Sequence, residues 1–351
     1  MTFLQAVILE CLQKINGERT IYSIYHLLTG KKSSQTIQDA HLFQLTHLFK
    51  TLPGLKRQQF NAYIDTLHQE SYLNEGEEST KYFVSDQGYD AYMTFFQRCP
   101  MPEYIQGLKL QDATILMWKR LTLLIQAASH LIHSINRYYP IQRDPEIYTW
   151  VRDFLTNYRG GRSRLSKDLF KELHTIFSTD FPENPFLIVA RLSGWERIGL
   201  TGKQTAEQMG LEETEYHYRF LNGLHFIIQT VTQQRGAFPI LNSLITDVYQ
   251  KVPYTKSTFR TYELLQQDFS ILQIAAMRGL KESTVEDHII EIALSDRDFS
   301  IDSFIDQKTA AEISDIAKRL GQRKLKPIKE QVQDISYFQI RLVLARAGEK
   351  V

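Results

Sequence analysis

The sequence has few of the features that mark several common protein classes. Only two of its 351 residues are cysteines, Cys11 and Cys99, which excludes a disulfide scaffold and a cysteine-rich zinc site. No apolar run approaches the roughly 18 residues of a membrane-spanning helix. The first fifteen residues lack a basic leader and have the spacing of an amphipathic helix. We therefore expect a cytoplasmic protein without a membrane contact.

Glycine and proline are scarce as well, at 17 and 10 residues, below the average use of about 7% and 5%. Few helix breakers in so long a chain predict a mainly α protein, and its length predicts two or three domains. The 41 basic and 40 acidic side chains nearly balance in each of residues 1–100, 101–250 and 251–351. A protein that holds nucleic acid by bulk charge is thereby excluded, so any such contact must come from a local patch.

The motifs of common enzyme classes are also missing. Gly30-Lys31 and Gly202-Lys203 each lack the first glycine and the hydroxyl of a P-loop, and no GxGxxG, HExxH or GxSxG occurs. His130 and His133 share a helix face, but their neighbours are apolar and no acidic or cysteine ligand is near. This pattern favours packed helix histidines over a metal site. We expect no catalytic residue, no metal and no cofactor.

Residues 1–100 predict helices followed by a small hairpin. Apolar residues at helical spacing predict four helices, at about residues 4–15, 21–28, 36–49 and 60–73. A polar turn at residues 74–76 and a short strand at residues 81–84 follow them. This order resembles a winged-helix domain with a small β wing.

In a winged-helix interpretation, Lys56 and Arg57 lie at the start of the recognition-type helix, where they could contact phosphates. Winged helices also serve as protein-docking modules, and the nearby acids Asp65 and Glu70 weaken a DNA-reading role. The residues leave both alternatives open.

Residues 101–250 predict a helical middle domain, which begins after the breakers Pro100, Pro102 and Gly107. A long helical pattern covers residues 110–139, with apolar positions on more than one side. The stretch from Tyr158 to Lys167 places glycines among three arginines, Arg159, Arg162 and Arg164. Such a segment could follow a phosphate backbone, and the alternative is a solvated loop.

Two segments share the spacing of a helix-turn-helix. In each, a small alanine allows close helix crossing, a glycine supplies the turn, and a later apolar residue holds the second helix. These residues are Ala206, Gly210 and Tyr216 in a unit near residues 201–227, and Ala275, Gly279 and Val285 in residues 251–351. Thr214 and Ser283 are placed to cap the second helices.

The charges of these segments argue against reading of the major groove. The second helices present several acids, which repel phosphate: Glu212, Glu213, Glu215, Glu282, Glu286, Asp287 and Glu291. The best electrostatic footprint is a run of twelve residues without an acid, which contains Lys318, Arg319, Arg323, Lys324, Lys326 and Lys329. We expect weak, non-sequence-specific DNA contact there; a solvated helix end is the alternative.

Residues 270–288 resemble the helicase-type helix-turn-helix domain at the C terminus of many bacterial RecQ-type helicases, and residues 258–265, 325–330 and 335–341 resemble its flanking elements. Over its full length the chain resembles the YpbB family of Gram-positive bacteria. Members of that family are typically encoded beside a short RecQ-like helicase that lacks this domain. The resemblance implies a helicase partner that receives its helix-turn-helix from a separate chain.

The leading hypothesis is a non-catalytic accessory protein of a RecQ-like DNA helicase in DNA repair or recombination. A sequence-specific transcription regulator is one alternative, and it predicts selection of one operator, usually by a symmetric dimer. A protein-only scaffold is the other, and it predicts no salt-sensitive DNA binding.

Overall fold

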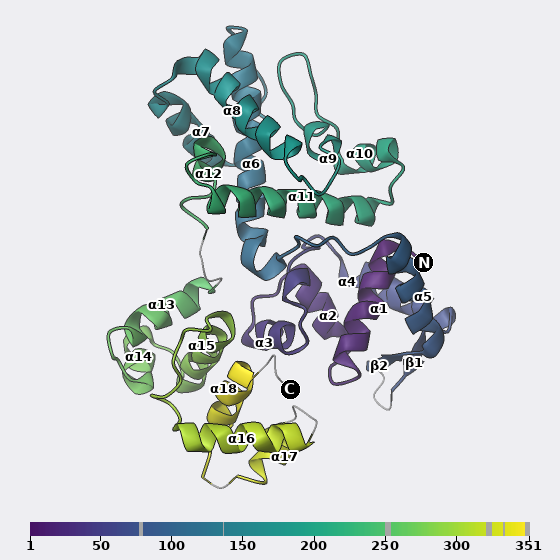
Figure 1. Cartoon of the computed structure of the whole chain (residues 1–351), viewed down its shortest axis with the longest axis vertical. Helices are drawn as coiled ribbons and strands as arrows, with labels where there is room; N and C mark the ends of the chain where they lie inside the picture. The colour runs from purple at the N-terminus through teal and green to yellow at the C-terminus, as the bar shows by residue number, and fades with distance from the viewer. Residues whose placement is uncertain (77–79, 136, 250–253, 321–324, 333, 348–351) are drawn as a thin grey trace. The chain divides into compact units, whose positions relative to one another are not determined.

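The computed structural model describes residues 1–76, 80–135, 137–249, 254–320, 325–332 and 334–347. It is mainly helical, with one hairpin of two short strands in this part of the chain (Figure 1), which confirms the expected fold class. The chain divides into two compact units. The first comprises Met1–Ile21 and Lys50–Tyr249, and the second comprises Tyr22–Phe49 and Gln250–Val351. The three domains expected from the sequence stay a prediction.

The amino-terminal part of the first unit packs three helices with the hairpin. It contains α1 (Phe3–Ile15), α4 (Arg57–Gln69), β1 (Leu73–Glu75), β2 (Tyr82–Val84) and α5 (Asp86–Arg98). A capping box between Thr2 and Gln5 starts α1. β1 and β2 pair antiparallel with Leu73 opposite Val84, so the strand predicted at residues 81–84 is present, whereas residues 73–75, predicted as a helix end and a turn, form the other strand. The resemblance of residues 1–100 to a winged helix stays a prediction.

A close contact with the backbone requires a glycine after the hairpin. A Cβ at Gly88, in the first turn of α5, would lie 2.3 Å from the carbonyl oxygen of Tyr72. Only glycine fits there without displacement of the backbone before β1.

The middle part of the first unit is built around one long helix, α6 (Gly107–Ile132). The helices that complete it are α7 (Pro145–Asn157), α8 (Gly161–Ser178), α9 (Phe186–Val189), α10 (Gly202–Met209), α11 (Glu213–Gln233) and α12 (Pro239–Ser243). Helix α6 contacts α7, α8 and α11, which explains its apolar residues on more than one side (Figure 1). Arg120 of α6 donates to both carboxylate oxygens of Asp247 at 2.6 and 2.7 Å.

The helix predicted over residues 110–139 ends seven residues early, at Ile132. Ser134 adopts a positive φ of 57°, and residues 137–140 are not helical. The residue before a proline is disfavoured in the α region, so Pro140 prevents the helix from continuing through Tyr139. The prediction counted apolar spacing beyond this break and was wrong for residues 133–135 and 137–139.

The second unit combines α2 (Ile21–Thr29), α3 (Ser34–Leu42) and η1 (Thr46–Leu48) with the C-terminal helices. These are α13 (Lys256–Leu265), α14 (Ile271–Arg278), α15 (Glu282–Ser295), α16 (Gln307–Leu320), α17 (Leu325–Lys329) and α18 (Tyr337–Ala347). Helix α15 is central, because it contacts α13, α14, α18 and α3 (Figure 1). The helix predicted over residues 36–49 is divided into α3 and η1 by Gln44, whose φ is 55°.

Throughout the described ranges, the helices are too short or too polar for any of them to span a membrane.

Candidate nucleic-acid interface

The helix-turn-helix of the second unit is formed by α14 and α15. Ser270 and Gln273 form a capping box at the start of α14, and Gly279 ends the helix with a φ of 62°. The amide of Leu280 donates to the carbonyl of Ala275 at 2.9 Å, which closes the turn. Ala275 and Val285 are buried at 6% and 0% exposure. The alanine, glycine and valine predicted from the sequence therefore lie at the helix crossing, the turn and the core.

Helices α10 and α11 of the first unit repeat this construction. Thr201 forms a capping box with Gln204, and Gly210 ends α10 with a φ of 66°. Ala206 and Tyr216 are each 2% exposed. The hydroxyl of Tyr216 donates to the carbonyl of Leu187 at 2.9 Å, so this side chain also ties α11 to α9.

The caps predicted for the second helices are wrong. Glu212, not Thr214, caps α11, because its carboxylate accepts from the amide of Thr214 at 3.2 Å. Helix α15 begins after Lys281, whose side chain makes no capping hydrogen bond, so Ser283 lies inside the helix. In both cases the chain enters the helix earlier than the hydroxyl residue.

Helix α15 is enclosed over most of its length. Glu291 is 3% exposed and accepts from the amide of Thr255 and from the hydroxyl of Thr258, each at 2.7 Å. Burial raises the pKa of Glu291. His288 is hydrogen-bonded to Thr261 at 2.8 Å, and burial lowers the pKa of this histidine to about 4.

Helix α3 contributes to this enclosure from a distant part of the sequence. It contacts α15, and Arg341 of α18 donates to both Gln38 of α3 and Asp287 of α15. Only the first turn of α15 is open, at Glu282 and Ser283. A helix that lies inside its own unit, with an acid at its open end, cannot enter a major groove in this conformation.

The basic cluster predicted near the C terminus is partly open. Lys318 and Arg319 are exposed in the last turn of α16, and Lys326 is exposed on α17. Lys329 is half-buried and donates to the carbonyl of Ile335. Arg323 and Lys324 lie outside the described residues.

Carboxylates share the surface of this cluster. Glu312 and Asp315 of α16 line the same hollow as Lys318 and Arg319. Because acids one turn away reduce the local positive potential, any contact of this surface with phosphate will be weak and sensitive to salt.

The other predicted basic residues belong to the first unit. Lys56 and Arg57 are exposed at the start of α4. Arg159 is exposed just before α8, and Arg164 is exposed on that helix with an ion pair to Asp168 at 3.4 Å. The side chain of Arg162 lies outside the described part. Residues from Gly161 onward are helical, so the glycine-rich loop that the sequence suggested is limited to one turn.

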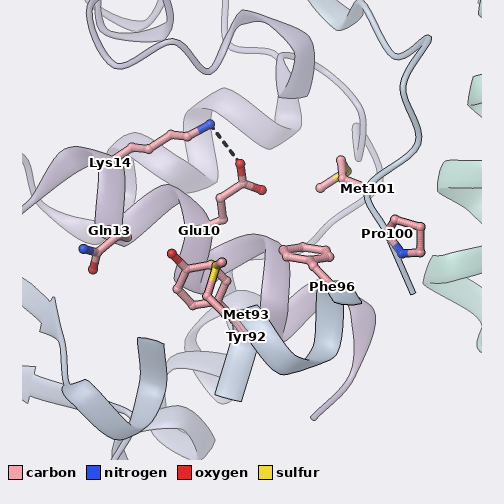
Figure 2. Close-up of a pocket in the computed structure, with 8 residues that line it drawn as sticks. All are labelled: Glu10, Gln13, Lys14, Tyr92, Met93, Phe96, Pro100 and Met101. Carbon is pink, nitrogen blue, oxygen red and sulfur yellow. Dashed lines mark ion pairs between the residues drawn. The ribbon is translucent and has the colours of Figure 1, made fainter. Parts of the chain in front are cut away.

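A hollow of about 350 Å³ lies between α1 and α5 (Figure 2). Its apolar lining comes from Tyr92, Met93 and Phe96 of α5, and its charged groups are Glu10 and Lys14 of α1. These two charges pair at 2.8 Å and so compensate one another. Within the described ranges no three or more His, Cys, Asp or Glu side chains are grouped to hold a metal ion.

The histidines of α6 make aromatic contacts. The ring of His130 stacks on Tyr138 with centroids 4.2 Å apart, and the ring of His133 stacks on Trp195 at 3.8 Å. Sequence reasoning missed the segment after α6, where Tyr139 is 94% exposed. Pro140 and the cations on either side of it, Arg137 and Arg143, were visible in the sequence. They were overlooked because residues 110–139 were predicted to form one helix.

Comparison with known proteins decides the family. The chain is 33% identical over 347 residues to protein YpbB from Bacillus subtilis (strain 168), which covers 99% of this chain and 98% of that protein. The chain belongs to the YpbB family. Residues 257–344 match a family described as a helix-turn-helix domain, and this range includes α14 and α15. The family and the C-terminal helix-turn-helix expected from the sequence are thus confirmed, and no solved structure matches the chain.

Proposed function

We propose that this YpbB-family protein is a non-catalytic accessory protein of a RecQ-like DNA helicase in the cytoplasm, where it acts in DNA repair or recombination. The helix-turn-helix domain supports a role at DNA. The enclosure of α15 is the observation that carries the proposal. Because the second helix is buried, the domain is suited to contacts with the DNA phosphate backbone and with other proteins, not to reading bases. The helicase partner rests on the resemblance of residues 270–288 to the helicase domain.

Direct DNA contact is assigned in this proposal to the cluster at the end of α16 and on α17. Lys318, Arg319 and Lys326 are exposed and belong to helices that pack together. Side chains of this kind position a protein on phosphates without reading sequence. The neighbouring Glu312 and Asp315 limit the affinity, in keeping with a protein that assists a helicase already on DNA.

The two other hypotheses make different use of the same features. A sequence-specific regulator needs a reading helix in the groove, and the enclosure of α15 disfavours it. A protein-only scaffold needs no free cations, and the exposure of Lys318, Arg319 and Lys326 disfavours it.

Co-purification tests the partner. The full chain is mixed at micromolar concentration with the RecQ-like helicase encoded in the same genome, and we expect the two to elute together in gel filtration. Separate elution of two folded proteins at this concentration contradicts the proposal. Fluorescence anisotropy with single-stranded, forked and duplex DNA at two salt concentrations tests the DNA contact independently, and an absence of binding at low salt favours the scaffold.

A further inference from the structure

The segment that follows α6 is a non-helical strip held firmly against that helix. The side-chain amide of Gln126 donates to the carbonyl of Tyr139 at 3.1 Å and accepts from the amide of Ile141 at 2.8 Å. Gln142 donates to the hydroxyl of Thr122 at 3.1 Å, and Tyr138 stacks on His130. Backbone and side-chain contacts at residues 138, 139, 141 and 142 therefore hold the strip in place.

The side chains of alternate residues in the strip, from Arg137 to Arg143, face solvent. Tyr139 is 94% exposed and Ile141 is 41% exposed, and the flanking Arg137 and Arg143 are exposed as well. Neither arginine has an ion pair with any other side chain that the structure describes. The strip therefore presents a cation, an aromatic ring, an aliphatic side chain and a second cation in succession.

The acid that follows the strip in the sequence, Asp144, is already paired with other groups. The carboxylate of Asp144 caps α7 by accepting from the amide of Glu146 at 3.1 Å, and it pairs with Lys119 at 3.1 Å. These contacts lower the pKa of Asp144, the hydrogen bond to Lys119 most of all. The charge that follows Arg143 is thus balanced, which leaves the strip with a positive excess.

A second exposed ring lies one helical turn further along α6. Trp195 is 38% exposed, stacks on His133, and its amide donates to the hydroxyl of Ser129 at 3.0 Å. Ile198, in the same short turn, is 91% exposed, and Glu196 is its exposed acid. His130 lies in the last turn of α6 and His133 is its C-cap residue, so the rings of Tyr138 and Trp195 flank the same end of α6.

We propose that the strip from Arg137 to Arg143 binds single-stranded nucleic acid. A base stacks on the open face of Tyr139, and Arg137 and Arg143 contact phosphates on either side. Duplex DNA fits poorly, because stacking on a protein ring requires a base that is free of its neighbours. The strip is pre-organised by Gln126 and Gln142, which lowers the entropy cost of binding. This inference adds a strand-binding site to the proposed accessory function and shares with it only the assumption that nucleic acid is a partner.

The test is fluorescence anisotropy of the full chain with a labelled oligothymidine of about 15 nucleotides, and with its uridine counterpart. We expect Tyr139→Ala to weaken single-strand binding by about 5- to 150-fold, the range that corresponds to the loss of one stacked base. Tyr139→Phe retains the ring and should bind as the unchanged protein does. The matched control is Phe170→Ala on α8, which removes another ring of 68% exposure and should have no effect.

Further arms separate this proposal from the proposed function. The pair Arg137→Gln and Arg143→Gln should also weaken binding and reduce its salt dependence. If Tyr139→Ala binds the oligonucleotide normally while changes at Lys318, Arg319 and Lys326 abolish binding, the strip proposal is overturned and the accessory function stands.

The remaining outcomes are equally decisive. Loss of helicase co-purification in Tyr139→Ala, with unchanged oligonucleotide binding, makes the strip a protein-docking surface and overturns the proposal. No binding of either oligonucleotide at low salt overturns it too, whereas co-elution with the helicase would still support the accessory function. Tighter binding of the uridine oligonucleotide that is weakened by Tyr139→Ala supports the strip and identifies RNA as the favoured strand.

Discussion

At the scale of single residues, Gly210 and Gly279 play the same role in separate units: each ends the first helix of a helix-turn-helix in a left-handed conformation. Gly210 has φ and ψ of 66° and 28°, and Gly279 has 62° and 34°. At either position an added Cβ would meet nothing within 4 Å. The requirement for glycine is therefore conformational, because a left-handed backbone is costly for residues with a Cβ.

We expect Gly279→Ala to lower the free energy of unfolding by about 1–2 kcal/mol, the cost of one non-glycine residue in the left-handed region. Urea denaturation followed by circular dichroism measures it. The control is Gly54→Ala, where a Cβ also meets nothing within 4 Å and φ is not positive, so the free energy of unfolding should rise slightly, by about 0.4–1 kcal/mol. Equal stability of the Gly279→Ala variant and the unchanged protein would contradict the argument.

Buried histidines make the fold sensitive to acid. His225 of α11 is fully buried; its Nδ1 accepts from the amide of Gln106 at 3.0 Å and its Nε2 lies 3.3 Å from the Oε1 of Gln111. This pairing requires the neutral ring with its proton on Nε2, and burial lowers the pKa of His225 to about 3.

A histidine whose pKa is lowered in the folded protein stabilises it above the unfolded pKa of about 6.5, and this stability is lost as the pH falls toward the folded pKa. We expect the free energy of unfolding to fall by about 1.4 kcal/mol per pH unit for His225 between pH 6 and 4. Urea titrations at several pH values measure the slope. In His225→Gln the slope should be smaller by about 1.4 kcal/mol per pH unit, the contribution of one proton. An unchanged slope would show that the imidazole is protonated in the folded chain.

At the scale of elements, the local start and stop signals were predictable and the partners of each element were not. The spacing of Leu4 to Ile15 matches α1, and the glycines at 210 and 279 end the helices where the sequence placed turns. Thr214 and Ser283 misled because a carboxylate and a lysine backbone occupy the cap positions instead. A hydroxyl residue has no fixed distance from the true N-cap, so its presence alone does not locate the start of a helix.

The contact of α3 with α15 could not be predicted from the sequence. Nearly 250 residues separate the two helices, and short-range periodicity carries no information about which distant face covers a helix. The end of α6 was a different kind of miss: Pro140 was visible and disfavoured a helix at Tyr139, but the helix already stops at Ile132, before Ser134 adopts a positive φ of 57°. Because residues 137–139 were predicted to be helical, the sequence analysis did not identify the strip at residues 137–143 as a candidate site.

Arg341 joins three helices of the second unit, because it donates to Gln38 of α3 and to Asp287 of α15 from its place on α18. Its side chain is 27% exposed. We expect Arg341→Leu to lower the free energy of unfolding by about 1–3 kcal/mol, since Asp287 loses its charged partner. Arg341→Lys keeps the charge on a shorter side chain without the planar guanidinium, so an intermediate loss is expected in urea denaturation. If the lysine and leucine variants are equally stable, the bridging role of the guanidinium is wrong.

At the scale of the whole molecule, charge is balanced and its functional use is local. A formal net charge of +1 gives no general attraction to nucleic acid, so each proposed contact depends on a few exposed cations. One group lies on α16 and α17 of the second unit, and the strip after α6 lies in the first unit. A chain with separate weak sites gains affinity when both engage one strand, provided its parts can span the distance between them.

The salt dependence of DNA binding tests this distribution. For duplex DNA we expect the logarithm of the association constant to fall with the logarithm of salt concentration, with a slope of about −0.9 for each phosphate contacted. Replacement of Lys318, Arg319 and Lys326 by glutamine should make that slope shallower by about 0.9 for each side chain that contacts phosphate. The matched control changes three other exposed lysines, Lys109, Lys171 and Lys203, to glutamine, which alters the net charge equally. Equal slopes for the two triple variants would mean that duplex binding follows overall charge, and the assignment of the contact to α16 and α17 would then be wrong.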